Sequence, residues 1–453
     1  MEFTESIQQK VGARSVTQKV LVLLIFPGFL STVGNAQQSP ISMAVETSAG
    51  AQAQTQTPPS PPVDLDDLVG QALKKNPGVQ SALRQVEALR HRVPQAKTLP
   101  DPKAAVGWMG NIKPFSVQHL DPSSYRGISA MQDIPFPGKL KLQGEIADRE
   151  AEAAWWDYEA ARRKVVSDVK EAYYDYFYYW KALEITKKDK DLLQKLSSIA
   201  EARYRVGKGV QQDVLKSQVE ISLLDQRLTV LEQQEKTAQA RLNTLLFRDP
   251  ETPLAPPEKF VPAKLDHSLD ELYTLARGQD TGLQREQRVI ERDQYAVNLA
   301  RKHYRPDFTV AYMYQQRPDL MDMHGFTVTA NIPIFYRTKQ RELVKEAKAQ
   351  LEATQLNKEN RQTELFFAVK AEYLEAKSSE DLMKLYSQAV VPQSSLTLES
   401  SMASYEVGTV DFLTILENFT TVLDYEVNYY RELSNYQMAL ARLEPLVGVE
   451  LTK

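Results

Sequence analysis

The sequence predicts an α+β membrane protein in which long coiled-coil helices carry four short transmembrane β-strands per chain. Three observations lead to this fold class. The chain repeats itself once, each repeat holds a long helical stretch with little proline or glycine, and each repeat holds two short segments that alternate apolar and polar residues. A unit that occurs twice in this way predicts an internal tandem duplication.

The internal repeat consists of six short matches that keep one order and an offset between 198 and 206 residues. The matched segments, copy one first, are Leu65–Leu68 with Leu269–Leu272, Pro100–Asp101 with Pro306–Asp307, Ile128–Pro135 with Phe326–Pro333, Val169–Tyr173 with Val369–Tyr373, Tyr204–Gly207 with Tyr405–Gly408, and Ala240–Leu242 with Ala441–Leu443. Chance would not preserve this order and spacing. We therefore expect a first structural repeat over 63–250, a linker over 251–267 and a second repeat over 268–453.

Each repeat is expected to run helix, strand, strand, long helix, turn, helix. The first helix is predicted over about 64–97. The long helix of copy one is predicted over roughly 139–205, a stretch that contains no proline. At about 1.5 Å per residue the long helix would extend on the order of 100 Å. Its apolar residues step by four and three, as in a coiled-coil seam, at Val169, Tyr173, Tyr176, Trp180 and Leu183. Copy two repeats this helix over about 336–404, interrupted late by Pro392. Helices of this length predict an elongated coiled assembly.

The strand segments place apolar and aromatic residues on one face and small or polar residues on the other. The residues expected on the apolar face are Trp108, Ile128, Phe308, Val310, Tyr312, Tyr314, Phe326 and Val328. About ten residues with this two-residue period is typical of a transmembrane β-strand. The loops at 111–124 and 317–324 carry turn-forming residues. The alternative is an ordinary sheet of two hairpins packed on helices.

Four strands cannot close into a barrel, and lipid does not tolerate open sheet edges. Several chains must then contribute: two chains supply eight strands and three supply twelve. The residues alone do not choose between these numbers.

The N-terminus has the features of a secretory signal peptide over 1–36. Basic residues precede an apolar run, Val20–Leu30, and small residues follow, ending at Ala36. The apolar run is too short to cross a bilayer as a helix, although an uncleaved anchor is the alternative. Residues 37–62 are rich in Gln, Ala, Ser, Thr and Pro and are expected to form a disordered leader.

Composition excludes several functions. The chain has no cysteine, only five histidines and a net charge of −4, so thiol chemistry is excluded and no basic surface for nucleic acid is expected. No motif for catalysis, cofactor binding or metal binding is present, and we expect no enzyme activity, no cofactor and no metal site. The aromatic run 173–180 is better explained by packing between helices than by ligand stacking, and the soft ligands of Met321–His324 lie in a predicted surface loop.

The duplicated unit, the Tyr-x-Val-Gly turn and the Asp-Ile-Pro strand end resemble the TolC-type outer-membrane efflux family, over about 65–451. The stretches Gln132–Leu140 and Pro100–Pro102 are most similar to the heavy-metal (cation) efflux branch. The resemblance implies a homotrimer with a twelve-stranded β-barrel in outer-membrane lipid and a helical coiled-coil barrel in the periplasm. It also implies a periplasmic adaptor and an inner-membrane RND-type pump as partners. Many relatives begin with a lipid-modified cysteine, and this chain has none.

Two tight helix–helix turns are expected at the periplasmic tip. Their residues are Val206, Gly207 and Lys208 in copy one and Val407, Gly408 and Thr409 in copy two. Glycine permits the positive φ that reverses a helix tightly. The resemblance implies that these turns also meet the helical hairpins of the adaptor; the alternative is that the glycines only cap the helices.

Just beyond the turns, the resemblance implies an aperture gate formed by Asp213, Tyr405, Thr414 and Glu417. Asp213 and Tyr405 match positions whose hydrogen bonds hold the tip closed in the family, and Val410 replaces an arginine that some relatives add. Glu417 matches a carboxylate that lines the constriction. Three copies of Glu417 would form an anionic ring that favours cations; the alternative is a surface charge on a solvated coil.

These features predict a passive outer-membrane conduit from periplasm to exterior, in a tripartite efflux system for small molecules or metal cations. An exported coiled-coil protein of the envelope, or the outer-membrane channel of type I protein secretion, is the alternative. The exported substrate, the particular adaptor and pump, and the resting state of the tip are not predicted.

Overall fold

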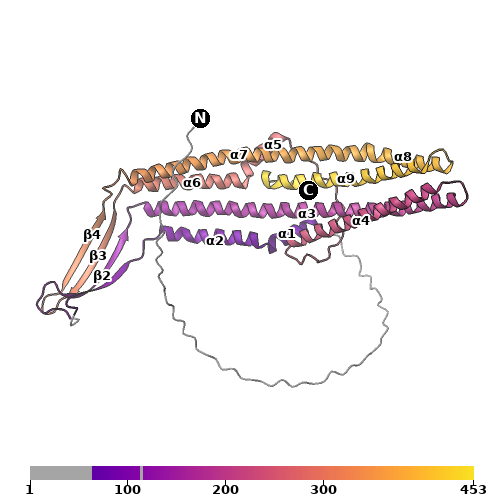
Figure 1. The fold of residues 1–453 in the computed structure, drawn as a ribbon. Helices are drawn as coiled ribbons and strands as arrows, with labels where there is room; N and C mark the ends of the chain where they lie inside the picture. Colours follow the sequence, from indigo (N-terminus) through magenta and orange to yellow (C-terminus); the bar gives the residue numbers. More distant parts are fainter. Residues whose placement is uncertain (1–63, 113–115, 453) are drawn as a thin grey trace, which may run out of the picture. The chain divides into compact units, whose positions relative to one another are not determined.

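The computed structural model describes residues 64–112 and 116–452, which belong to one compact unit, 58–453 (Figure 1). This unit is mostly helical with one small antiparallel sheet. The predicted signal peptide, 1–36, and the predicted leader, 37–62, lie outside the described residues.

The first half contains four helices and two strands: α1 (Leu65–Lys75), α2 (Pro77–Lys97), β1 (Lys103–Met109), β2 (Tyr125–Ile134), α3 (Lys139–Arg205) and α4 (Gln211–Leu245). The prediction of one helix over 64–97 is wrong, because the chain is extended at Asn76 and starts a new helix there. Pro77 disfavours a helical conformation for the residue before it. The Asn76 side chain accepts from the backbone N–H of Val79 and so caps α2.

The second half has the same order: α5 (Leu269–Gln279), α6 (Thr281–Lys302), β3 (Asp307–Gln316), β4 (Met323–Asn331), α7 (Gln340–Leu385), a π-helical turn (Tyr386–Val390), α8 (Val391–Glu406) and α9 (Phe412–Val447). The predicted interruption near Pro392 is a π-helical turn, after which the chain continues directly as α8. Ser268 caps α5 in a reciprocal capping box with Glu271.

The four strands form one antiparallel sheet in the order β1-β2-β3-β4. The first half of the chain supplies β1 and β2, the second half supplies β3 and β4, and the central pair β2–β3 joins the two halves. Figure 1 shows the strands at one end of the helices and the α3–α4 and α8–α9 turns at the other. In between, α3 packs against α2, α4, α6 and α9.

The core between the helices has three clusters of buried apolar residues. One joins α3, α4, α8 and α9, one joins α5, α7 and α9, and one joins α1, α3 and α4. Five residues of the aromatic run of α3 are buried, namely Tyr173, Tyr174, Tyr176, Phe177 and Tyr178. The ring centre of Phe177 lies 4.6 Å from that of Phe260, in the segment between α4 and α5, and 6.3 Å from that of Tyr430 on α9. The rings therefore pack in the interior, as predicted, but against this segment as well as against other helices.

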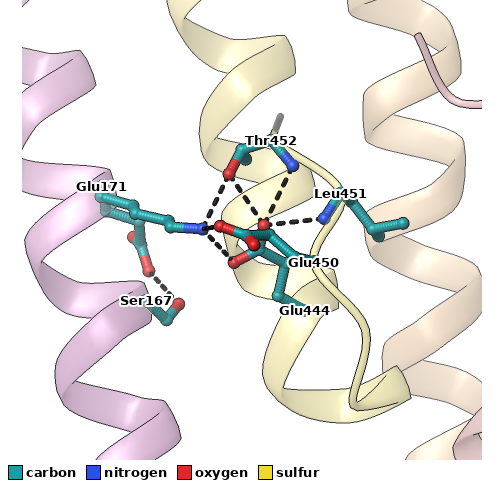
Figure 2. A network of polar contacts seen from close by, with 7 residues as sticks. Ser167, Glu171, Glu444, Glu450, Leu451 and Thr452 are labelled. Atoms are coloured by element: carbon teal, nitrogen blue, oxygen red, sulfur yellow. Dashed lines mark hydrogen bonds and ion pairs between the residues drawn. The ribbon is translucent and has the colours of Figure 1, made fainter. Parts of the chain in front are cut away.

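A buried polar network fastens the last residues of the described chain to α3 and α9 (Figure 2). The Lys170 ammonium, whose side chain is 3% exposed, lies 2.7 Å from Glu444 and 3.3 Å from Glu450. Glu444 also accepts from the backbone N–H groups of Leu451 and Thr452 and from the Thr452 hydroxyl. Burying the charges of Lys170 and Glu444 costs desolvation free energy, and these several hydrogen bonds and ion pairs offset that cost.

Candidate membrane and docking surfaces

The register of the sheet places all eight residues predicted for the apolar strand face on one side. Directly paired residues of antiparallel strands share a face. The pairs on this face include Val106 with Ile128, Ile128 with Tyr314, Val310 with Val328 and Tyr312 with Phe326, and Trp108 lies two residues along β1 from Val106.

This apolar face is exposed in the single chain. Val106 is 87% exposed, Phe326 71% and Val328 57%. The opposite face carries small and polar side chains, among them Ser129 and Thr329. Large exposed apolar faces mark contact with a partner or with lipid. Within residues 64–112 and 116–452, none of the helices combines the length and the apolar character needed to cross a bilayer.

The α3–α4 turn ends α3 with a Schellman motif. Gly207 has φ +71°, its N–H donates to the Tyr204 carbonyl, and the N–H of Lys208 donates to the Arg203 carbonyl. These two bonds satisfy carbonyls at the helix end, and only glycine adopts this conformation without strain.

The α8–α9 turn has the same geometry. Gly408 has φ +78°, its N–H donates to the Tyr405 carbonyl, and the N–H of Thr409 donates to the Ser404 carbonyl. All six residues predicted for the tip, Val206, Gly207, Lys208, Val407, Gly408 and Thr409, are exposed. Val206 and Val407 are 67% and 77% exposed, so each turn presents an apolar side chain to its surroundings.

Arg203 connects the two turns. Its guanidinium lies 4.3 Å from the centre of the Tyr405 ring and donates to the Tyr405 carbonyl. This cation–π contact adds to a charge-assisted hydrogen bond. The sequence reasoning missed Arg203. The sequence signal for Arg203 was that the residue matched to it in the second half of the chain is Ser404, which has no charge, so the two turns differ at this position.

Of the predicted gate residues, Asp213 and Tyr405 lie near Arg203, but no hydrogen bond joins Asp213 to Tyr405 in the described chain. The Tyr405 hydroxyl is buried without a hydrogen-bond partner among the described residues, and this burial raises its pKa. Burial and the Asp411 carboxylate raise the pKa of Asp213, while the nearby Arg203 opposes the shift. Because both groups lie near Arg203, ionisation of the Asp213 carboxyl or of the Tyr405 hydroxyl would change the electrostatic potential at the other group.

Thr414 and Glu417 lie in the first turns of α9. Thr414 donates both its backbone N–H and its hydroxyl to Asp411, which caps the helix. Glu417 is exposed and forms no ion pair within residues 64–112 and 116–452. Its carboxylate is therefore available to solvent, whereas the Thr414 hydroxyl is already used.

The described part of the chain contains no group of three His, Asp or Glu side chains arranged to hold a metal ion. In the segment Met321–His324, the imidazole Nδ1 of His324 lies 2.7 Å from the Tyr312 hydroxyl. The prediction that this segment is entirely a surface loop is wrong at its end, because Met323 and His324 are the first residues of β4 and pair with Gln315 and Tyr314 of β3.

The chain belongs to the outer membrane efflux protein family, whose model matches residues 68–246 and again 272–449. The family is one of outer-membrane efflux proteins, so the chain is assigned to the outer membrane. Comparison with curated proteins found no significant match.

Several solved structures share the fold. VceC from Vibrio cholerae aligns with a TM-score of 0.71 and 14% identity, covering 85% of this chain and 96% of that one. CusC aligns with a TM-score of 0.72 and 17% identity, covering 84% and 91%. The open state of MtrE from Neisseria gonorrhoeae aligns with a TM-score of 0.72 and 17% identity, covering 86% and 89%. At these identities the likeness is one of fold.

Proposed function

We propose that this chain is the outer-membrane subunit of a tripartite efflux system, a passive trimeric conduit from periplasm to exterior. The observation that carries the proposal is the sheet, which has one exposed apolar face and two strands with an unpaired edge. Within the part of the chain that the structure describes, β1 pairs only with β2, and β4 pairs only with β3. Neither edge is tolerated in lipid unless another chain completes it.

Three copies would supply twelve strands and close the sheet into a barrel around the polar face. The same order of elements in both halves and the double match of the family model support a duplicated unit. In this arrangement the apolar face meets lipid, and the face with Ser129 and Thr329 lines the channel.

Exposed apolar residues on the helices support assembly with neighbouring subunits. On α4, Leu215, Val219 and Leu223 follow each other at intervals of four residues and are each about half exposed. On α7, Phe367 is 74% exposed and Leu374 is 53% exposed. A stripe of this kind is buried when helices pack side by side in a coiled assembly.

The tip residues would meet the periplasmic adaptor, which connects the conduit to an inner-membrane RND-type pump. The exposed Val206 and Val407, each held out by a glycine turn, support an apolar docking contact. Inside the tip, Asp213, Tyr405, Thr414 and Glu417 would form the gate, with Glu417 facing the passing substrate. The cargo of this conduit would be small molecules or metal cations.

Adjacent residues on the two sheet faces test the proposal. Val328 lies on the apolar face and Thr329 on the polar face. An arginine facing the bilayer midplane costs about 2–4 kcal/mol, whereas one facing the channel contacts water. We expect Val328→Arg to reduce heat-modifiable trimers in the outer-membrane fraction and Thr329→Arg to leave them intact. Equal behaviour of the two variants, or an unsubstituted protein recovered as a monomer without detergent, would overturn the proposal in favour of an envelope coiled coil.

A further inference from the structure

The internal repeat extends to the pairing of the strands. Strand β1 matches β3 at an offset of 206 residues, and β2 matches β4 at an offset of 198. When the β1–β2 register is shifted by these offsets, the pair Ala104–Ala130 becomes Val310–Val328, which is the observed β3–β4 register. The repeat therefore predicts strand pairing to the residue.

The same offsets can be applied to the β2–β3 register. Adding 198 to a β2 residue gives a β4 residue, and subtracting 206 from a β3 residue gives a β1 residue, so the result is a pairing between β4 and β1. The pair Ile128–Tyr314 becomes Phe326 with Trp108, and Asp133–Thr309 becomes Asn331 with Lys103. In one chain β1 and β4 lie at opposite edges of the sheet, so this β1 belongs to a second copy. The shifted register sets residues of the apolar face opposite each other, such as Phe326 and Trp108, and residues of the polar face opposite each other, such as Asn331 and Lys103. Both faces of the sheet therefore continue across the boundary.

An ion pair between a buried lysine and a partly exposed aspartate holds the base of the central strand pair. The Lys139 side chain at the start of α3 is 4% exposed, and its ammonium lies 2.8 Å from one Asp307 carboxylate oxygen and 2.9 Å from the other. The backbone N–H of Phe136 donates to the same carboxylate at 2.7 Å. These contacts tie the β2–α3 junction to the first residue of β3.

At the same repeat offsets, Arg337 corresponds to Lys139 and Asp101 corresponds to Asp307. Both residues are exposed, and neither forms an ion pair within 64–112 and 116–452. The neighbouring residues are also less covered in the second half of the chain: Phe136, beside Lys139, is half-buried, whereas its counterpart Ile334, near Arg337, is 69% exposed. The helix start differs as well: α3 begins at Lys139, whereas α7 begins at Gln340, beyond Arg337.

We propose that Arg337 of one copy binds Asp101 of the next copy, and that β4 pairs with the neighbouring β1 in the register that sets Phe326 opposite Trp108. The inference rests on the proposed function, because it requires the chain to assemble with itself. Arginine can hold a carboxylate with two parallel hydrogen bonds, so it replaces lysine at this position without loss of the contact. The pair locks each subunit boundary at the point where strands continue into helices.

Cysteine pairs test the register, because the natural chain has no cysteine. Ala105→Cys with Thr329→Cys should link subunits into covalent dimers and trimers on oxidation or with a short bis-thiol reagent. The repeat-equivalent pair Met131→Cys with Ala311→Cys lies within one chain and should link without changing the oligomer mass. Ala105→Cys with Thr327→Cys, displaced by two residues, should link poorly.

Two results would overturn the register but not the trimer. One is stronger linking by the displaced pair, Ala105→Cys with Thr327→Cys. The other is no linking by Ala105→Cys with Thr329→Cys in intact trimers, while the within-chain control pair does link. Absence of any oligomer by native mass spectrometry of the unsubstituted protein would instead overturn the proposed function.

Charge exchange tests the ion pair. Asp101→Arg and Arg337→Asp should each lower the temperature at which trimers dissociate in detergent, and the double variant should recover most of that loss. Recovery is the result that a merely structural role of either residue would not produce. A double variant that dissociates at a lower temperature than both single variants would show that the two residues do not meet.

Discussion

Replacement of Glu444 by leucine should destabilise the chain more than any exposed substitution of similar size. The change removes the main counter-ion of Lys170, whose side chain is 3% exposed. Removing one partner of a buried ion pair typically costs about 3–5 kcal/mol, because the remaining charge is uncompensated. Lys170 would keep Glu450 at 3.3 Å and the Thr452 hydroxyl at 2.8 Å. We therefore expect the loss at the lower end of this range, about 3 kcal/mol.

The matched control is Lys164→Met on the same helix. Lys164 pairs with Asp168 at 2.8 Å, but its side chain is 73% exposed. Such a pair contributes about 0.3–0.5 kcal/mol. Guanidinium unfolding of purified trimers in detergent, followed by helical circular dichroism, compares the two variants. Equal midpoints for Glu444→Leu and Lys164→Met would refute the reasoning that the buried network fastens the end of α9 to α3.

Three further predictions concern the tip and the helices. Bulky charged residues at both Gly207 and Gly408, which have positive φ, should abolish efflux while trimers still form; normal export of a known substrate by the double variant would exclude docking through these turns. Glu417→Gln should weaken the response of single-channel conductance to divalent cations, and an unchanged response would exclude an anionic ring. Burial raises the pKa of Asp189 from 3.8 to about 6, so the folded chain binds this proton more tightly than the unfolded chain, and the stability falls as pH rises through 6. Asp189→Asn should therefore raise the free energy of unfolding at pH 7.5 by up to about 3 kcal/mol and change it little at pH 4; equal gains at both values would contradict this.

The helices and strands were largely predictable because their signals are local. The bounds predicted for α3, roughly 139–205, agree with the observed helix, which Gly138 precedes and Gly207 follows. The apolar strand face was predicted from its two-residue period, and the register brings its residues together across all four strands. The break at Asn76 was missed because the residues on both sides have helical patterns, although Pro77 and the capping side chain of Asn76 are local signals for a new helix start.

The polar contacts that hold distant segments together could not be predicted. Lys139 and Asp307 lie far apart in the chain, as do Lys170 and Glu444, and each looked like an ordinary charge on a helix or at a strand end. Only the fold brings them together, and it buries both lysines and Glu444. Arg203 belongs to the same category, because its partner Tyr405 lies in the other half of the chain.

The β2–β3 pairing has a consequence for the way the sheet closes. A polypeptide with only one half of this chain would hold a single hairpin with two open edges, and would need twice as many copies to complete the same ring. The covalent connection makes every second hairpin contact an intramolecular event, at a high effective concentration that does not depend on expression level. In the proposed ring, half of the contacts between hairpins would thus be present before any two subunits meet, and fewer encounters between subunits would remain.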